Sequence, residues 1–115
     1  MQLVSSVQNV VQSNQTEKEI TLTIIVPAYN EAEVLHTFHH ELSKVLATLP
    51  SEQVEVLYIN DGSKDSTWEI MQDLPAHHAN IELINLSRNF GKEAAMTAGF
   101  DLAKGQCAIV LDADL

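Results

Sequence analysis

Residues 20–31 read ITLTIIVPAYNE, an apolar and β-branched run that a proline ends and a polar segment follows. An apolar run of this kind predicts a buried strand over residues 20–26. Residues 34–49 then repeat apolar side chains at helical spacing, and Pro50 stops the pattern. The apolar positions of this helix are Val34, Leu35, Phe38, Leu42, Val45, Leu46 and Leu49. A buried strand followed by an amphipathic helix is the start of a βαβ unit, which favours a parallel sheet.

Three further apolar runs repeat the strand pattern along the chain. They lie at Val54–Ile59, Ile81–Leu86 and Cys107–Leu111. The first of them is closed by a strong turn signal, Asn60-Asp61-Gly62. The sequence therefore predicts four strands in all.

The segments between these strands predict helices. Ser66-Thr67-Trp68-Glu69 fits a capping box, which would begin a short helix that ends near Leu74-Pro75. The alanine-rich segment Phe90–Ala103 predicts a longer helix, with Gly105 as the glycine that closes it. The order βαβαβαβ predicts an α/β fold with a mostly parallel sheet.

Composition excludes several classes of protein. The 115 residues are 45% hydrophobic, which suits one folded domain with a modest core. A net charge of −10, with only six Lys and Arg residues, argues against nucleic acid as a partner. No apolar run approaches the roughly 20 residues of a membrane helix and no signal peptide is recognisable, so we expect a cytoplasmic protein. The single cysteine, Cys107, excludes an internal disulfide, and we expect it in the core.

The two ends of the sequence differ in character. Residues 1–19 have no clear period, so we expect a flexible N-terminal arm before a domain at 20–115. The sequence stops shortly after the fourth strand, at Asp114-Leu115, and we therefore interpret 20–115 as the truncated first part of a larger domain. An unfinished sheet edge also favours pairing with a second copy, so a homo-oligomer is a further hypothesis.

Polar clusters follow all four predicted strands. They are Pro27–Glu31, Asn60–Ser63, Ser87–Lys92 and Asp112–Asp114. Ligands of open α/β sheets bind at the edge where the parallel strands end. The sequence therefore predicts a ligand site at this edge.

Asp112 and Asp114 form the sharpest pair of chemical groups in these clusters. Alternation along a strand puts residues i and i+2 on the same side, so both carboxylates can face one point. Hard oxygen ligands favour Mg²⁺ or Mn²⁺, which would also attract an anion to a chain of net charge −10. The alternative is a solvated acidic turn, and we favour the metal site.

Other polar residues are weaker candidates. Asp61 precedes a glycine that allows a left-handed turn and a close approach to a ligand, although an ordinary Asp-Gly turn is an equal alternative. Arg88 and Lys92 flank a predicted helix start, where anions bind, or are simply surface charges. His36 and His40 have the spacing of a zinc pair, but no further ligand is spaced to complete a site, so we assign them no metal.

Four motifs carry a resemblance to a known family: Val26–Glu31 (VPAYNE), Asn60–Thr67 (NDGSKDST), Ser87–Ala94 (SRNFGKEA) and Asp112–Leu115 (DADL). Together they resemble the N-terminal half of family 2 glycosyltransferases, which have the Rossmann-like GT-A fold. They are most similar to the polyprenyl-phosphate branch, which includes dolichol-phosphate mannosyltransferases and undecaprenyl-phosphate glucosyltransferases. The resemblance covers about residues 20–115.

This resemblance implies a reaction. It implies a metal-dependent, inverting transfer of a sugar from a UDP- or GDP-sugar to an acceptor, in this branch a polyprenyl phosphate, with Mg²⁺ or Mn²⁺ as cofactor. Residues 20–115 would be the nucleotide-sugar-binding part, inactive or weakly active alone. The whole protein would act at the cytoplasmic face of the membrane, in the building of the cell envelope.

The resemblance also implies roles for single residues. The substrate-binding residues would be Pro27, Tyr29, Glu31, Asp61, Arg88 and Lys92. The first three would line the nucleoside pocket, Asp61 would contact the base or ribose, and the two basic residues would lie near the diphosphate. Asp112 and Asp114 would hold the metal and so form the catalytic pair. Asn60 departs from many relatives, which have a second aspartate there, and this could alter base selection.

Two other functions stay open from the residues alone. One is a non-catalytic nucleotide- or metal-binding regulatory module, which leaves the Ser87–Lys92 cluster unexplained. The other is a phosphatase with Asp112 as nucleophile, which usually has a following helix and a downstream lysine that this sequence lacks.

Overall fold

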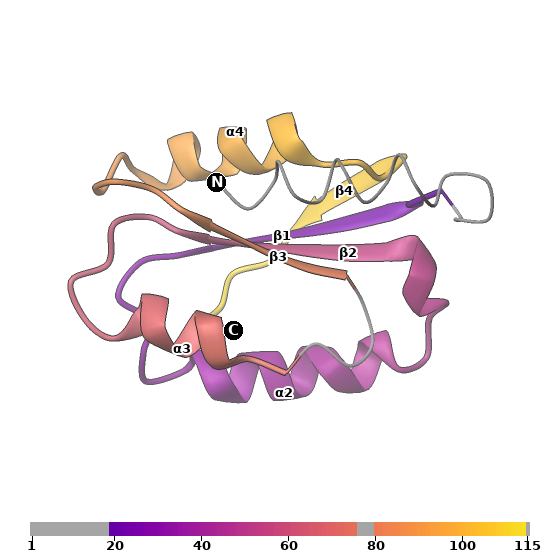
Figure 1. Cartoon of the computed structure of the whole chain (residues 1–115), viewed down its shortest axis with the longest axis horizontal. Helices are drawn as coiled ribbons and strands as arrows, with labels where there is room; N and C mark the ends of the chain where they lie inside the picture. The colour runs from indigo at the N-terminus through magenta and orange to yellow at the C-terminus, as the bar shows by residue number, and fades with distance from the viewer. Residues whose placement is uncertain (1–18, 76–79, 115) are drawn as a thin grey trace.

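The computed structural model describes residues 19–75 and 80–114, in which four parallel strands form one sheet with helices on both faces (Figure 1). The strands are β1 (Leu22–Ala28), β2 (Val54–Asn60), β3 (Asn80–Asn85) and β4 (Cys107–Val110). The helices are α2 (Leu35–Leu46), α3 (Thr67–Asp73) and α4 (Lys92–Leu102), and a 3-10 turn, η1 (Ser51–Gln53), precedes β2. The sheet order is β3-β2-β1-β4. The predicted α/β fold with βαβαβαβ order is confirmed.

Two apolar clusters attach the helices to the sheet. Helices α2 and α3 cover one face of the sheet, and α4 covers the other (Figure 1). Because strand side chains alternate between faces, Ile24 lies in the cluster with Leu35 of α2, whereas Ile25 lies in the cluster with Ala95 of α4. β2 is buried along its whole length because it lies between two strands and two helical layers.

Pro27 lies inside β1, whereas the sequence predicts it as the end of the strand. The carbonyl of Ile25 accepts a hydrogen bond from Leu111 N at 2.9 Å, on the side of β4. Alternation points the nitrogen of Pro27 to the same side, and the register of β4 ends opposite Ile25, at Val110. The missing N–H of proline therefore breaks no sheet hydrogen bond.

Two predicted helix signals act differently from expectation. Helix α3 begins at Thr67, but the Ser66 side chain makes no capping hydrogen bond, and Asp65 Oδ1 accepts the N–H of Thr67 at 2.9 Å instead. Gly105 does not have the left-handed backbone of a closing glycine. A Cβ on Gly105 would lie 2.7 Å from the backbone nitrogen of Thr23, so this glycine allows the loop before β4 to approach β1.

Two side chains predicted in the apolar interior are exposed. Cys107 begins β4, which among the described strands pairs only with β1, and its thiol is exposed. Val45 is 57% exposed, because α2 faces the sheet through a neighbouring stripe that includes Phe38 and Leu42. Both corrections concern which surface of an element is covered, which depends on its neighbours in space.

Residues 1–18, most of the predicted N-terminal arm, lie outside the described residues. In the part of the chain that the structure describes, no helix combines the length and the apolar character needed to cross a membrane.

Candidate functional site

The loops after the four strands form a polar cavity of about 370 Å³ at the carboxyl edge of the sheet. Its lining residues are Pro27, Ala28, Tyr29, Glu31, Asp61, Asn89, Gly91, Lys92, Asp112 and Asp114. Each strand is followed by at least one of them, as expected for a ligand site of a parallel sheet. Seven of the eight predicted site residues therefore share one cavity, and Arg88 is the exception.

Arg88 has a partner within its own loop. Its side chain is exposed, and its guanidinium carbon lies 4.7 Å from the centroid of the Phe90 ring. This cation–π contact holds the guanidinium against the β3–α4 loop. Arg88 does not line the cavity, so the cavity gives no evidence for the prediction that Arg88 lies near a donor diphosphate.

Asp61 fixes the loop between β3 and α4 to the end of β2. Asp61 is only 3% exposed. One of its carboxylate oxygens accepts the N–H of Phe90 at 2.9 Å, and the other accepts the N–H of Gly91 at 3.1 Å. The backbone carbonyl of Asp61 accepts a further hydrogen bond from Asn89 Nδ2 at 3.3 Å. Hydrogen bonds from backbone N–H groups stabilise a buried carboxylate, and here they also set the position of the loop.

Gly62 lets the β2–α3 loop touch the β3–α4 loop. Its φ is 67°, in the left-handed region predicted from the sequence. A Cβ at this position would lie 2.2 Å from both the carbonyl carbon of Arg88 and the nitrogen of Asn89. The close approach that glycine allows here is thus to the chain's own loop, whereas the sequence left open an approach to a ligand or an ordinary Asp-Gly turn.

One part of the cavity lining is acidic, and its carboxylates are those of Glu31, Asp112 and Asp114. Lys92 Nζ contacts Asp112 Oδ1 at 2.5 Å, with both side chains about half exposed. The hydrogen bond to Asp112 and the nearby charges of Asp114 and Glu31 raise the pKa of Lys92. Burial, followed by the charges of Asp114 and Asp112, raises the pKa of Glu31. The three carboxylates therefore make a negative wall that Lys92 partly neutralises.

Asp112 and Asp114 offer oxygen donors to a divalent cation. Both line the cavity, and buried Ala113 separates them. Within residues 19–75 and 80–114, no group of three or more His, Cys, Asp or Glu side chains is arranged to hold a metal. Two carboxylates fit a cation such as Mg²⁺, which keeps several waters and takes further oxygen ligands from substrate phosphates. The donor set is thus compatible with the predicted Mg²⁺ or Mn²⁺.

Asn60 does not line this cavity. Its buried side chain donates to Asn85 Oδ1 at 2.7 Å and accepts the N–H of Ser63 at 3.2 Å. It lines a separate polar pocket of about 270 Å³ between the ends of β2 and β3. The side-chain amide of Asn60 therefore joins the ends of β2 and β3. An aspartate at this position would lack the NH₂ group that donates to Asn85.

Asn89 and Gly91 also line the cavity, and neither was among the predicted site residues. Both lie inside the predicted polar cluster Ser87–Lys92, so their place between two basic candidates was the available signal. Gly91 has a φ of 103° at the position just before α4, a backbone conformation that favours glycine.

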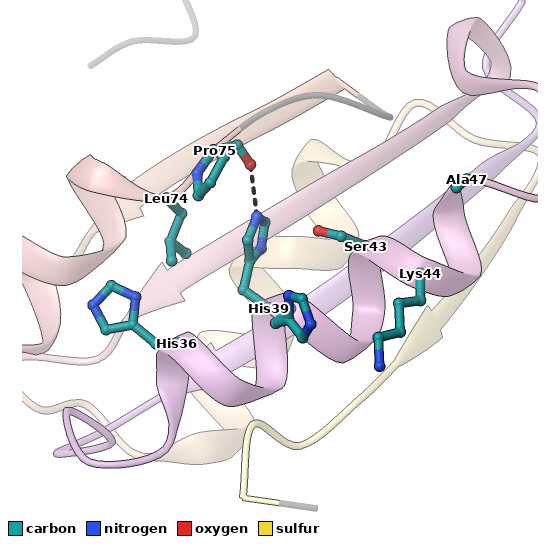
Figure 2. Close-up of a pocket in the computed structure, with 8 residues that line it drawn as sticks. His36, His39, Ser43, Lys44, Ala47, Leu74 and Pro75 are labelled. Atoms are coloured by element: carbon teal, nitrogen blue, oxygen red, sulfur yellow. Dashed lines mark hydrogen bonds between the residues drawn. The ribbon is translucent and has the colours of Figure 1, made fainter.

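A larger cavity of about 550 Å³ lies against α2 and the segment after α3 (Figure 2). Its lining residues are His36, His39, His40, Ser43, Lys44, Ala47, Leu74 and Pro75. The buried imidazole of His39 joins two segments, with Nδ1 2.6 Å from Tyr58 Oη and Nε2 2.6 Å from the Pro75 carbonyl oxygen. His36 and His40 are exposed. Because this cavity lacks the converging carboxylates, we assign the chemistry to the smaller one.

The comparison with known families decides the identity of the domain. The sequence model described as Glycosyl transferase family 2 matches residues 23–115, a stretch that contains every residue lining the cavity. The chain belongs to glycosyl transferase family 2. The predicted family is confirmed, and the four polar strand ends of this family 2 chain are the segments that form its cavity.

A curated relative is similar to the family 2 chain in sequence, and a solved structure is similar to it in fold. It is 38% identical over 94 residues to the bactoprenol glucosyl transferase of Shigella phage SfV, a match that covers 82% of this chain and 30% of that protein. S. aureus TarS in complex with UDP has a TM-score of 0.73 at 23% identity, covering 83% of this chain and 28% of that chain.

A second solved structure has the same fold. The mannosyltransferase PcManGT of Pyrobaculum calidifontis, in complex with GDP-Man and Mn²⁺, has a TM-score of 0.65 at 21% identity, covering 94% of this chain and 34% of that chain. At these identities the likeness shows the GT-A fold. The family 2 chain spans 30% of the length of the curated relatives it matches.

Proposed function

We propose that this chain is the nucleotide-sugar-binding part of a glycosyltransferase that transfers a sugar from a UDP- or GDP-sugar to a polyprenyl phosphate. The observation that carries the proposal is the convergence of Asp61, Lys92 and Asp112 on one cavity at the carboxyl edge of a family 2 sheet. Its volume of about 370 Å³ is within the range of small-molecule sites. The name of the phage SfV relative supports the acceptor class, because bactoprenol is a polyprenyl lipid.

In this proposal the nucleoside lies along Pro27, Tyr29 and Glu31. Tyr29 is 39% exposed, so its ring is accessible to a base. The oxygens of Asp61 each accept one backbone N–H, and each carboxylate oxygen has a second lone pair for a donor group of the nucleoside. Asp61 can therefore hold its loop and contact the base or ribose at the same time.

Asp112 and Asp114 would hold Mg²⁺ or Mn²⁺ beside the donor diphosphate. A bound cation would supply Lewis-acid stabilisation of the negative charge that develops on the leaving diphosphate. Lys92, whose pKa is raised by its hydrogen bond to Asp112 and by neighbouring carboxylates, carries a positive charge at neutral pH and adds to this stabilisation. The Mn²⁺ bound with GDP-Man in PcManGT supports the assignment of a divalent cation.

The transfer would invert the anomeric carbon, with an oxygen of the acceptor phosphate attacking opposite the leaving diphosphate. A phosphate monoester is largely ionised at neutral pH, so this attack needs no strong general base. The acceptor, the cytoplasmic face of the membrane as the place of action, and a homo-oligomer that covers the edge of β4 are proposals for the whole protein. Among the described strands, β4 has a neighbour on one side only.

Calorimetry on this chain tests the proposed donor site. We expect UDP or GDP to bind at least about tenfold more tightly with Mn²⁺ than with EDTA, because a cation held by Asp112 and Asp114 would attract the diphosphate. Binding that does not depend on the cation would contradict the proposed metal site. Failure of both nucleotides to bind would contradict the donor site itself.

Asp61→Asn separates nucleoside contact from metal binding. Loss of one carboxylate acceptor leaves a donor group unpaired, either of the nucleoside or of the β3–α4 loop that Asp61 holds, and is expected to weaken nucleotide binding by about 1–3 kcal/mol, or about 5- to 150-fold. The ratio of affinities with Mn²⁺ and EDTA is expected to stay at its wild-type value. Asp73→Asn, at the exposed end of α3, is the control and should bind as the wild type does. Loss of the cation dependence in Asp61→Asn would place Asp61 in the metal shell instead.

A further inference from the structure

Two loops at the carboxyl edge of the sheet are joined by hydrogen bonds. Residues 30–32 follow β1, and residues 63–66 follow β2 and lead to Thr67, the first residue of α3. The backbone N–H of Asn30 donates to Ser63 Oγ at 2.9 Å, and the N–H of Lys64 donates to Asn30 Oδ1 at 2.8 Å. Asn30 has a φ of 55°, which is uncommon outside glycine. These two bonds hold it in that conformation.

The buried hydroxyl of Thr67 is at the centre of this connection. Thr67 is 0% exposed, and its Oγ1 accepts the N–H of Glu31 at 2.9 Å while it donates to Asp65 Oδ1. The other carboxylate oxygen of Asp65 accepts the N–H of Ala32 at 3.3 Å. Burial acts to raise the pKa of Asp65, but hydrogen bonds from Thr67 and Ala32 outweigh it and lower that pKa. The pair therefore holds two successive amides of the neighbouring loop.

Glu31 links this connection to the cavity. Its side chain lines the cavity, whereas Asp65 and Thr67 are not among the lining residues. The carbonyl of Glu31 accepts the N–H groups of Val34 and Leu35 at 3.1 and 3.0 Å, at the start of α2. A shift of the Glu31 backbone would therefore move a wall of the cavity and the beginning of a helix together.

We propose that Thr67 and Asp65 are positioning residues for the donor nucleotide. They fix the backbone of Glu31, so that the part of the cavity that Glu31 lines is formed before the nucleotide binds. The inference rests on the proposed function, since it concerns the nucleotide of the same cavity. A preformed wall favours binding because the loop need not be ordered when the ligand arrives. Neither residue has to touch the nucleotide to have this effect.

A set of matched variants tests the proposal in the 115-residue chain. Thr67→Val removes the hydroxyl at nearly constant volume, and Thr67→Ser keeps the hydroxyl. Asp65→Ala, at an exposed position, keeps the Thr67 hydroxyl in the chain but removes the carboxylate that accepts it, together with the acceptor for the N–H groups of Thr67 and Ala32. Thr21→Val is the control, because Thr21 Oγ1 donates to Gln53 O at 3.2 Å and does not line the cavity.

Two measurements apply to each variant: the amide hydrogen exchange of Glu31 by NMR, and the Kd of UDP and GDP with Mn²⁺ by calorimetry. Thr67→Val is expected to speed the exchange and to raise the Kd about tenfold. Asp65→Ala should also raise both the exchange rate of the Glu31 amide and the Kd of the nucleotide. Thr67→Ser should restore the wild-type values, and Thr21→Val should leave the Kd unchanged.

Faster exchange in Thr67→Val with an unchanged Kd would overturn the positioning role, and so would an equal rise of Kd in Thr21→Val. If Thr67→Val does not fold, Asp65→Ala decides, and an unchanged Kd in that variant overturns the proposal. Failure of the wild-type chain to bind either nucleotide would instead overturn the proposed function, and the positioning role with it. The two failures differ in whether the wild type binds.

Discussion

Asp112→Ala is expected to remove the cation dependence of nucleotide binding altogether. The ratio of UDP or GDP affinities with Mn²⁺ and with EDTA should fall from at least about tenfold to about one, because one of the two proposed carboxylate ligands is lost. Stability should change little, since Asp112 and its partner Lys92 are about half exposed. Calorimetry gives the affinities, and urea unfolding checks the stability.

Asp101→Ala is the matched control for this variant. Asp101 is exposed near the end of α4 and does not line the cavity. Its substitution by alanine removes the same charge from the chain as Asp112→Ala does. It should keep the full cation dependence. If Asp112→Ala keeps that dependence too, then Asp112 and Asp114 form an ordinary acidic strand end, and the metal assignment is wrong.

Gly62→Ala is expected to destabilise the fold by at least about 3 kcal/mol, because a left-handed alanine and an overpacked contact each destabilise. The new Cβ would lie 2.2 Å from two backbone atoms of Arg88 and Asn89, which cannot move as a side-chain end could. Relief of this clash should pull the β3–α4 loop from Asp61, and with it the N–H groups of Phe90 and Gly91. Urea unfolding measures the loss, and amide exchange of Phe90 reports the loop.

Gly91→Ala is the comparison for Gly62→Ala. Gly91 also has a positive φ, of 103°, but a Cβ there would meet no atom within 4 Å. It should lose only about 1–3 kcal/mol of backbone strain, and the Phe90 amide should stay protected. Equal losses in the two variants, with Phe90 protected in both, would show that the two loops do not approach each other as described.

Local patterns in the sequence determined the elements of this protein. A strand buried on both faces is apolar along its length, and a helix on a sheet repeats apolar residues every three to four positions. Both signals are read within one segment, so the strand starting near Ile20 and the helix starting near Val34 could be found without knowing their neighbours. The polar residues at the four strand ends could be found in the same way, within single segments. Their meeting at one edge was predictable because parallel strands bring their carboxyl ends together.

Strand boundaries and exposure needed the tertiary structure. Pro27 could remain in β1 only because β4 ends before it reaches that position, and the sequence of β1 carries no information on the length of β4. Cys107 is exposed because its strand lies at the edge of the described sheet. The order of strands is set by packing between segments far apart in the chain, which periodicity does not record.

The partners of the site residues were also decided only by the tertiary structure. Asp61 accepts hydrogen bonds from Phe90 and Gly91, which lie 29 and 30 positions later in the chain. The N–H of Glu31 donates to Thr67, 36 positions away. A motif shows that a carboxylate or hydroxyl is present at a strand end, but its hydrogen bonds depend on how close two loops come. At Gly62 that approach is possible because glycine has no Cβ, so the chain meets itself where the sequence alone left open a ligand or an ordinary turn.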